Sequence, residues 1–155
     1  MVSGLEQLYQ QIILDHAKHP HGVGLLAGEV TSHQRNPVCG DEITLALRWD
    51  AASEHVEAVA WEGAGCSISQ ASASLLATLA EESVAAGGAW APKELTALID
   101  EFREALRSRG STPLDEERFG DVAALSGVSK YVARVKCAML AWVAAEDILQ
   151  RARDK

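Results

Sequence analysis

The sequence predicts an α+β domain, in which a small antiparallel sheet of three strands carries helices on one face. Strand-like segments come before most of the helix-like ones, the two clearest strands are joined by a short turn, and the later segments each have one apolar face. Strands followed by helices are typical of α+β domains rather than of alternating parallel units. A chain of 155 residues is long enough for a hydrophobic core, so we expect residues 1–155 to form a single domain.

A first helix is expected from about residue 5 to residue 18. Ser3 and Glu6 match a capping box, and the apolar residues that follow have helical spacing: Leu5, Leu8, Tyr9, Ile12 and Ile13. A loop then leads to a first strand near residues 28–32. Three histidines at the end of this helix, His16, His19 and His21, could be metal ligands, although solvated histidines at a helix end and turn are the commoner case.

The two clearest strands are expected at residues 42–49 and 56–61. In the first of them Ile43, Leu45 and Leu47 alternate with more polar residues, which is the period of a half-buried strand. The connection over residues 50–54 is short and polar. We therefore expect the two strands to form an antiparallel hairpin.

Helical segments occupy the rest of the chain, at residues 67–82, 92–107 and 130–153, with a short helix near 122–125. Pro92 suits the first turn of a helix. The last helix has an apolar stripe that is expected to be buried: Tyr131, Val135, Ala138, Trp142, Ala145 and Leu149.

Composition excludes several classes of function. The net charge is −8 and no basic patch is visible, so nucleic acid is not an expected partner. No apolar run approaches the roughly 18 residues that cross a bilayer, so no membrane association is expected. The first residues lack a basic segment followed by an apolar one, as a secretory signal would have, and the expected location is cytoplasmic.

The three cysteines are the candidate functional residues. In a chain without an export signal, free thiols, a metal site or a reactive thiol are expected rather than a disulfide framework. Cys39 lies two residues before Asp41 and just before the hairpin, whereas Cys66 follows the hairpin and begins a helix. Both should therefore lie near the same end of the sheet. A last helix packed across the sheet could bring Cys137 there.

Local spacing alone does not decide what these residues do, because no CxxC pair is present. A cysteine can also be a small buried hydrophobic residue, and Asp41 can be a turn residue. Against this, the start of a helix favours negatively charged groups, such as the thiolate form in which cysteine binds metal or attacks. The residues alone therefore predict a thiolate-rich metal or redox site.

Longer motifs resemble a known family. The first lies between Leu8 and Pro20 and consists of Leu8-Tyr9, Asp15-His16 and His19-Pro20. The second is the stretch from Asn36 to Asp41, NPVCGD. The third is the stretch from Gly63 to Ser69, GAGCSIS, and the fourth is Arg134-Val135-Lys136-Cys137-Ala138. Together they look like the iron–sulfur cluster assembly family that includes IscU and SufU, which is NifU N-terminal-like. The resemblance covers nearly the whole chain.

Within this family the chain resembles the SufU branch. Scaffold proteins of the IscU type carry a histidine immediately before the third cysteine, and here that position is Lys136. The region 87–107 resembles the insertion typical of SufU proteins. Arg134 stands three residues before Cys137, as it does in that branch.

The resemblance implies a zinc site made by Cys39, Asp41, Cys66 and Cys137. It also implies a zinc-dependent sulfurtransferase that accepts persulfide sulfur from a SufS-type cysteine desulfurase and passes it to the downstream Suf assembly machinery. Cys39 matches the sulfur-accepting position. Arg134 is about 300° around the helix from Cys137, so it could pair with Asp41 or steady a released Cys39 thiolate; the alternative is a solvated surface arginine.

Two other functions remain open. The same thiolates could bind an iron–sulfur cluster, which would make the protein a scaffold. Alternatively, the domain could be a structural zinc-binding interaction module. Asp41 argues against a purely structural site, because closed structural zinc sites usually use cysteine and histidine.

Overall fold

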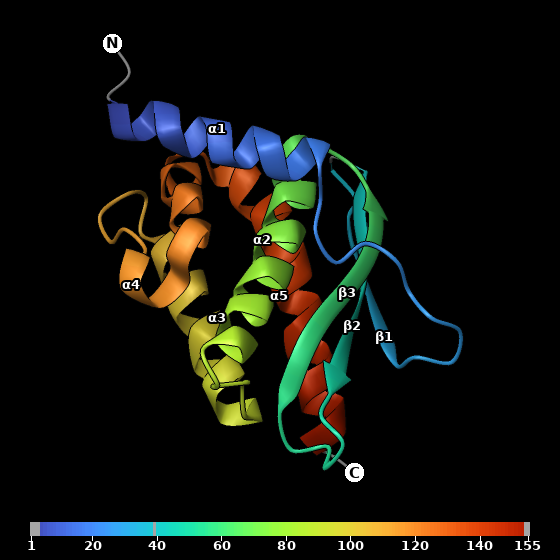
Figure 1. Cartoon of the computed structure of the whole chain (residues 1–155). Coiled ribbons are helices and arrows are strands. Elements are labelled where there is room, and N and C mark those ends of the chain that lie inside the picture. The colour runs from blue at the N-terminus through green and yellow to red at the C-terminus, as the bar shows by residue number, and fades with distance from the viewer. Residues whose placement is uncertain (1–3, 39, 154–155) are drawn as a thin grey trace.

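The computed structural model describes residues 4–38 and 40–153 of the chain. Figure 1 shows a three-stranded sheet with helices gathered on one side of it. The elements follow in the order α1 (Gly4–Lys18), β1 (Thr31–Asn36), β2 (Asp41–Trp49), β3 (Val56–Ala64), α2 (Ser67–Ala85), α3 (Pro92–Arg107), α4 (Glu116–Phe119), the 3-10 helix η1 (Gly120–Lys130) and α5 (Val132–Arg153). None of the helices in these ranges is long and apolar enough to cross a membrane.

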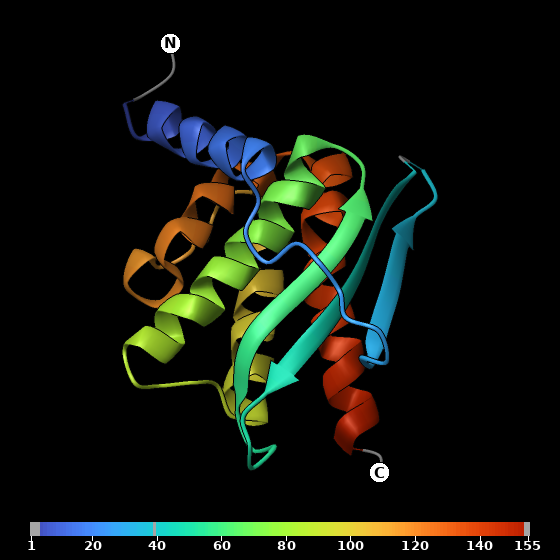
Figure 2. The same ribbon diagram turned by 45° about the vertical axis from the view of Figure 1, so that its right-hand side comes forward.

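The sheet is a simple antiparallel meander in the order β1-β2-β3 (Figure 2). Asn36 pairs with Asp41 across the β1–β2 turn, and Leu45 pairs with Trp61 across the hairpin. Ile43, Leu45 and Leu47 are buried, as their alternation predicts. The expected α+β architecture with a three-stranded antiparallel sheet is confirmed.

Helices α2 and α5 contact both the sheet and each other, and α3 packs on α5. Figure 1 accordingly shows α2 and α5 between the sheet and α3. The core between these layers is rich in aromatic side chains. Phe102 of α3 stacks on Trp142 of α5 with ring centroids 4.0 Å apart, and Trp61 of β3 is 2% exposed. This core holds the ends of α2 and α5 in fixed positions against the sheet.

The segment after α1 protects the free edge of β3. The backbone N–H of Gly24 donates to the carbonyl of Trp61 at 3.0 Å, and the Trp61 N–H donates to the carbonyl of Gly22 at 2.9 Å. An uncovered edge strand would offer these groups to other chains. The short pairing also fixes the end of α1 against β3 and α2.

Two elements and one residue differ from the sequence-based expectation. Strand β1 begins at Thr31 instead of near residue 28, and the expected short helix at 122–125 is part of the longer η1. Tyr131 was expected on the buried stripe of the last helix, but its side chain is 64% exposed. That prediction is wrong because Tyr131 follows the end of η1 and precedes α5, so the helical stripe does not extend to it.

Candidate metal centre

Three potential metal ligands meet at one end of the sheet. Asp41 is the first residue of β2, Cys66 immediately precedes α2, and Cys137 lies in the second turn of α5. One donor atom from each, two sulfurs and a carboxylate oxygen, lies within 4.8 Å of the others. The residues are far apart in the sequence, so only the packing of α2 and α5 on the sheet brings them together.

Asp41 is the centre of this group and is 2% exposed. Its Oδ1 accepts the backbone N–H of Cys66 at 2.9 Å, and its Oδ2 lies 3.3 Å from Cys66 Sγ. The approach requires glycine at position 65, because a Cβ there would lie 2.3 Å from Asp41 Oδ1. Gly65 also has φ +149°, a conformation that other residues rarely adopt.

The surroundings of Asp41 favour its charged form. Burial raises the pKa of this carboxyl, but hydrogen bonds from the Cys137 thiol and from the amide and thiol of Cys66 lower it, as does the charge of Arg134. The net result is a pKa below the ordinary value, so Asp41 is ionised at neutral pH. A buried carboxylate that faces two thiols is a favourable place for a cation.

Cys66 is held at the start of α2. It is the N-cap residue with an extended backbone (φ −73°, ψ 168°), and its side chain does not cap the helix, which leaves the sulfur available. Two side chains of the first turn hold the surrounding backbone: Ser69 Oγ donates to the Cys66 carbonyl at 3.0 Å, and Gln70 Nε2 donates to the Gly65 carbonyl at 2.9 Å. The predicted place of Cys66 at a helix N-terminus is confirmed.

Cys137 is buried, with 2% exposure. Next to it, Ser72 of α2 donates to the Ala138 carbonyl at 2.6 Å and accepts the indole N–H of Trp142 at 3.0 Å. This buried link fixes α5 against α2, the helix that Cys66 begins. The Asn36 amide also faces the thiol, with Nδ2 3.9 Å from Sγ.

The other predicted site residues have different outcomes. Cys39 lies outside the described residues, so its predicted role stays a prediction. Arg134 is exposed in the first turn of α5, and its charge acts on Asp41. Asn36 was not among the residues predicted from the sequence, because an asparagine before a proline indicates only a turn.

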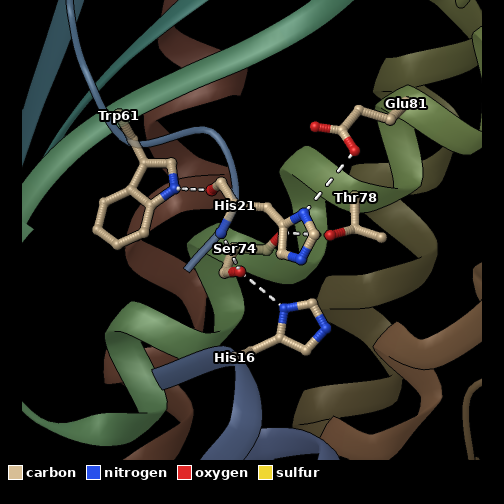
Figure 3. A network of polar contacts seen from close by, with 6 residues as sticks. All are labelled: His16, His21, Trp61, Ser74, Thr78 and Glu81. Carbon is tan, nitrogen blue, oxygen red and sulfur yellow. Dashed lines mark hydrogen bonds and ion pairs between the residues drawn. The ribbon is translucent and has the colours of Figure 1, made fainter. Parts of the chain in front are cut away.

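The N-terminal histidines form a different arrangement, shown in Figure 3. His16 Nδ1 lies 2.7 Å from Ser74 Oγ of α2, and the same Oγ accepts the backbone N–H of His21 at 2.8 Å. Trp61 Nε1 donates to the His21 carbonyl at 2.8 Å. Among the residues that the structure describes, these histidines belong to no group of three potential metal ligands. Their contacts join α1 and the following turn to α2 and β3.

The donor set fits a zinc ion. Zinc prefers thiolate, imidazole and carboxylate ligands in tetrahedral arrangement, and soft thiolates discriminate against magnesium and calcium. The described residues supply two thiols and one ionised carboxylate. A fourth ligand would complete the set, and the chain has one further thiol, Cys39.

Comparison with known proteins identifies the family. Residues 8–138 match the model of the NifU-like N terminal domain. The chain belongs to this family. Its fold also agrees with a crystal structure of a nitrogen-fixing NifU-like protein (N-terminal) from Brucella abortus, with a TM-score of 0.78 and 25% identity over 99% of each chain.

Two relatives of this NifU-like domain have different names. The zinc-dependent sulfurtransferase SufU of Bacillus subtilis is 35% identical over 93% of this chain and 90% of its own. The iron–sulfur cluster assembly scaffold protein IscU of Streptococcus pyogenes is also 35% identical, over 97% of this chain and 87% of its own. Overall identity therefore places the chain in the iron–sulfur cluster assembly family that contains both proteins, without separating the two functions.

Proposed function

We propose that this protein is a zinc-dependent sulfurtransferase, which accepts persulfide sulfur from a SufS-type cysteine desulfurase for iron–sulfur cluster assembly. The observation that carries the proposal is the convergence of Asp41, Cys66 and Cys137 within 4.8 Å. The relative named as a zinc-dependent sulfurtransferase supports the choice of metal and reaction. Lys136, where a scaffold-type histidine would stand, supports the same choice.

In this proposal Cys39, Asp41, Cys66 and Cys137 hold the zinc ion. The ion would keep the thiols in the thiolate form and, having no redox chemistry of its own, would not oxidise them. Three thiolates and a carboxylate carry four negative charges against two positive ones. This excess of negative charge favours the release of one ligand when a partner offers another. Cys39 is the best candidate for release, because the sequence places it between the ends of β1 and β2 rather than within a helix.

The transfer itself is a thiol–persulfide exchange. The Cys39 thiolate attacks the outer sulfur of the persulfide on the desulfurase cysteine. A new sulfur–sulfur bond forms on Cys39, the old one breaks, and the desulfurase cysteine leaves as a thiolate. One sulfur atom moves, no external oxidant or reductant is consumed, and the product is a persulfide on Cys39 for the downstream Suf assembly machinery.

Arg134 is proposed to serve the transfer without binding the metal. Its charge already acts on the Asp41 carboxylate. Once Cys39 leaves the ion, the same guanidinium would stabilise the free thiolate or hold Asp41. Exposure of Arg134 fits this role, because a partner that approaches the centre would meet it on the surface.

A second candidate function is that of an iron–sulfur cluster scaffold. The observation that favours it is the equal identity to the relative named IscU. Cysteine thiolates are also the usual ligands of iron–sulfur clusters. Reconstitution with iron and sulfide, in the presence of an equal concentration of zinc, distinguishes the two candidates. A cluster that persists under these conditions favours the scaffold.

The test of the proposed function is sulfur loading. The zinc-loaded protein is incubated with a SufS-type desulfurase and cysteine, alkylated without reductant, digested and analysed by mass spectrometry. We expect one added sulfur on Cys39, a faster turnover of the desulfurase, and neither effect with Cys39→Ser. Unchanged desulfurase turnover contradicts the sulfurtransferase proposal, and added sulfur only on Cys66 or Cys137 contradicts the choice of Cys39.

A further inference from the structure

Asn36 occupies a special position beside the proposed metal centre. It is the last residue of β1, pairs with Asp41 in the sheet register and is only 5% exposed. A buried amide must find partners for both its oxygen and its nitrogen. Those partners lie on two sides of the centre, one in the β1–β2 turn and one on α5.

The carbonyl groups of Asn36 hold the turn between β1 and β2. Its side-chain Oδ1 accepts the backbone N–H of Val38 at 3.2 Å, and its backbone carbonyl accepts the N–H of Gly40 at 2.8 Å. These two bonds fix the backbone on both sides of position 39. The turn contains the thiol that the proposed function assigns as sulfur acceptor.

The nitrogen of the same amide faces Cys137 on α5. Asn36 Nδ2 lies 3.9 Å from Cys137 Sγ of α5 and is the donor of this contact. An N–H that points at a metal-bound thiolate withdraws part of the negative charge from the sulfur. Partners of this kind orient the ligands of a metal and tune their strength.

We propose that Asn36 is a positioning residue, whose single amide sets the donor strength of the Cys137 thiolate and fixes the β1–β2 turn at the same time. This inference rests on the proposed zinc centre for the first of these effects. With four anionic ligands around a dication, a neutral donor relieves charge without adding a second cation. Only an amide of this length offers a donor at one end and an acceptor at the other.

The two effects can be separated by substitution. Asn36→Asp keeps an acceptor for the Val38 N–H but loses the donor to Cys137, whereas Asn36→Ala loses both. Ser32→Ala is the matched control, since Ser32 is also buried on β1 and also contacts α5, where its Oγ donates to Asp147 at 2.7 Å. Ser32 lies four residues before Asn36, away from the metal centre.

The first measurement uses cobalt in place of zinc at fixed pH. We expect the sulfur-to-cobalt charge-transfer band to move to longer wavelength in Asn36→Asp and Asn36→Ala, because the thiolate becomes more electron-rich. Zinc affinity, measured by competition with a chelator, should fall about 10–100-fold in both variants, because the Cys137 thiolate loses a group that orients it. Ser32→Ala should leave the band and the affinity unchanged. An unmoved band in Asn36→Asp overturns the part of the inference that concerns Cys137.

The second measurement is amide hydrogen exchange on the metal-free protein. We expect the Val38 amide to exchange faster in Asn36→Ala and at the wild-type rate in Asn36→Asp and Ser32→Ala. Equal Val38 exchange in Asn36→Ala and wild type overturns the part that concerns the turn.

The two measurements also separate this inference from the proposed function. A wild-type protein that binds cobalt without thiolate charge transfer contradicts the metal centre and, with it, the role of Asn36 toward Cys137. The exchange result still decides the role toward the turn. Conversely, normal cobalt spectra in every Asn36 variant contradict the part of the inference that concerns Cys137 and leave the metal centre intact.

Discussion

At the scale of single residues, the centre depends on how closely the backbone approaches Asp41. The Cys66 N–H reaches the carboxylate only because Gly65 has no side chain, since a Cβ at position 65 would lie 2.3 Å from Asp41 Oδ1. Gly65 therefore determines where the carboxylate lies relative to both sulfurs. The proposed centre therefore depends on the absence of a side chain at position 65.

The Gly65→Ala variant tests this dependence. The added methyl group must push Asp41 away from Cys66, so we expect zinc affinity to fall about 10–100-fold, as for the loss of a group that orients a ligand. Gly28→Ala is the control, because Gly28 also has a positive φ (+85°) but its Cβ would have nothing within 4 Å. The control should lose about 1–2 kcal/mol of stability from backbone strain and keep its zinc affinity. Unchanged zinc affinity in Gly65→Ala would show that Asp41 is not held by this contact.

Arg134 gives a second prediction at this scale. Arg134→Ala should keep its zinc, because arginine is not a ligand, but should load sulfur about ten-fold more slowly or worse, as hydrogen bonds to charged groups contribute about 1.5–3 kcal/mol. Arg134→Lys should recover part of the rate, since lysine keeps the charge but lacks the planar guanidinium. Lys136→Ala, another exposed cation on α5, is the control and should load normally. Normal loading by Arg134→Ala would show that Arg134 takes no part in sulfur transfer.

At the scale of elements, α1 packs against the core through side chains that are only partly buried, Tyr9, Ile12 and Ile13, and a polar contact joins its end to α2. None of the residues of α1 is fully buried. His16 near its end contacts Ser74, and the same hydroxyl accepts the His21 N–H (Figure 3). Because Oγ already accepts one hydrogen bond, its own proton is available for a neutral His16 ring. The contact between α1 and α2 is therefore expected to depend on the protonation of His16.

The direction of this pH dependence follows from the pKa of His16. Burial lowers this pKa, and so does the neighbouring His21, while Asp121 and Asp15 partly oppose them. His16 therefore binds a proton less readily in the folded protein than in the unfolded chain, where a histidine titrates near pH 6.5. The free energy of unfolding should be fully retained above about pH 6.5 and fall as the pH drops below it.

Denaturant unfolding between pH 7.5 and 5.5 measures the effect. His16→Gln can still contact Ser74 but cannot take up a proton, so its stability should fall less over this range than that of the wild type. The difference between the two proteins cancels the other titrating groups. His19→Gln, which changes an exposed histidine just after the end of α1, should behave like the wild type. Identical pH dependence of wild type and His16→Gln would contradict the prediction.

Among the elements, β2 could be predicted from the sequence, whereas the position of β1 and the start of α5 could not. The alternation of Ile43, Leu45 and Leu47 predicted β2 because one face of that strand is buried. Strand β1 has the sequence TSHQRN, and its position was missed because its buried residues, Ser32 and Asn36, are polar. Tyr131 was misplaced because spacing alone does not show that a 3-10 helix ends there and α5 begins one residue later.

For the whole molecule, the fold class followed from the order of the elements. The same order predicted that the residues on either side of the hairpin lie at one end of the sheet and left room for Cys137 to join them, whereas the full ligand set came from the family resemblance. A hairpin places residues before and after it at one end of the sheet, and a helix packed across the sheet can reach that end. The role of Asn36 and the close approach at Gly65 could not be predicted in this way. Both depend on distances of a few ångströms between elements that lie far apart in the sequence.

Zinc removal tests how the centre and the rest of the molecule depend on each other. The hydrophobic cluster around Phe102 of α3 and Trp142 of α5 does not include Asp41, Cys66 or Cys137. We therefore expect the metal-free protein to stay folded and to melt at a lower temperature. If free zinc is about 100 times its Kd, binding contributes about 2.7 kcal/mol, which corresponds to about 5–10 °C in Tm for a chain of this length.

Calorimetry with and without a chelator measures this difference. Cys66→Ser should melt near the temperature of the metal-free wild type and no longer respond to chelator, because it has lost a ligand. Ser32→Ala, whose change lies on the same sheet away from the centre, should still respond fully. Full zinc occupancy and an undiminished chelator response in Cys66→Ser would remove Cys66 from the ligands. If the wild-type protein instead unfolds completely on chelation, the packing of α2, α3 and α5 cannot hold the sheet without the metal. In that case the bonds from Asp41, Cys66 and Cys137 to the metal would be the main connection between β2, α2 and α5.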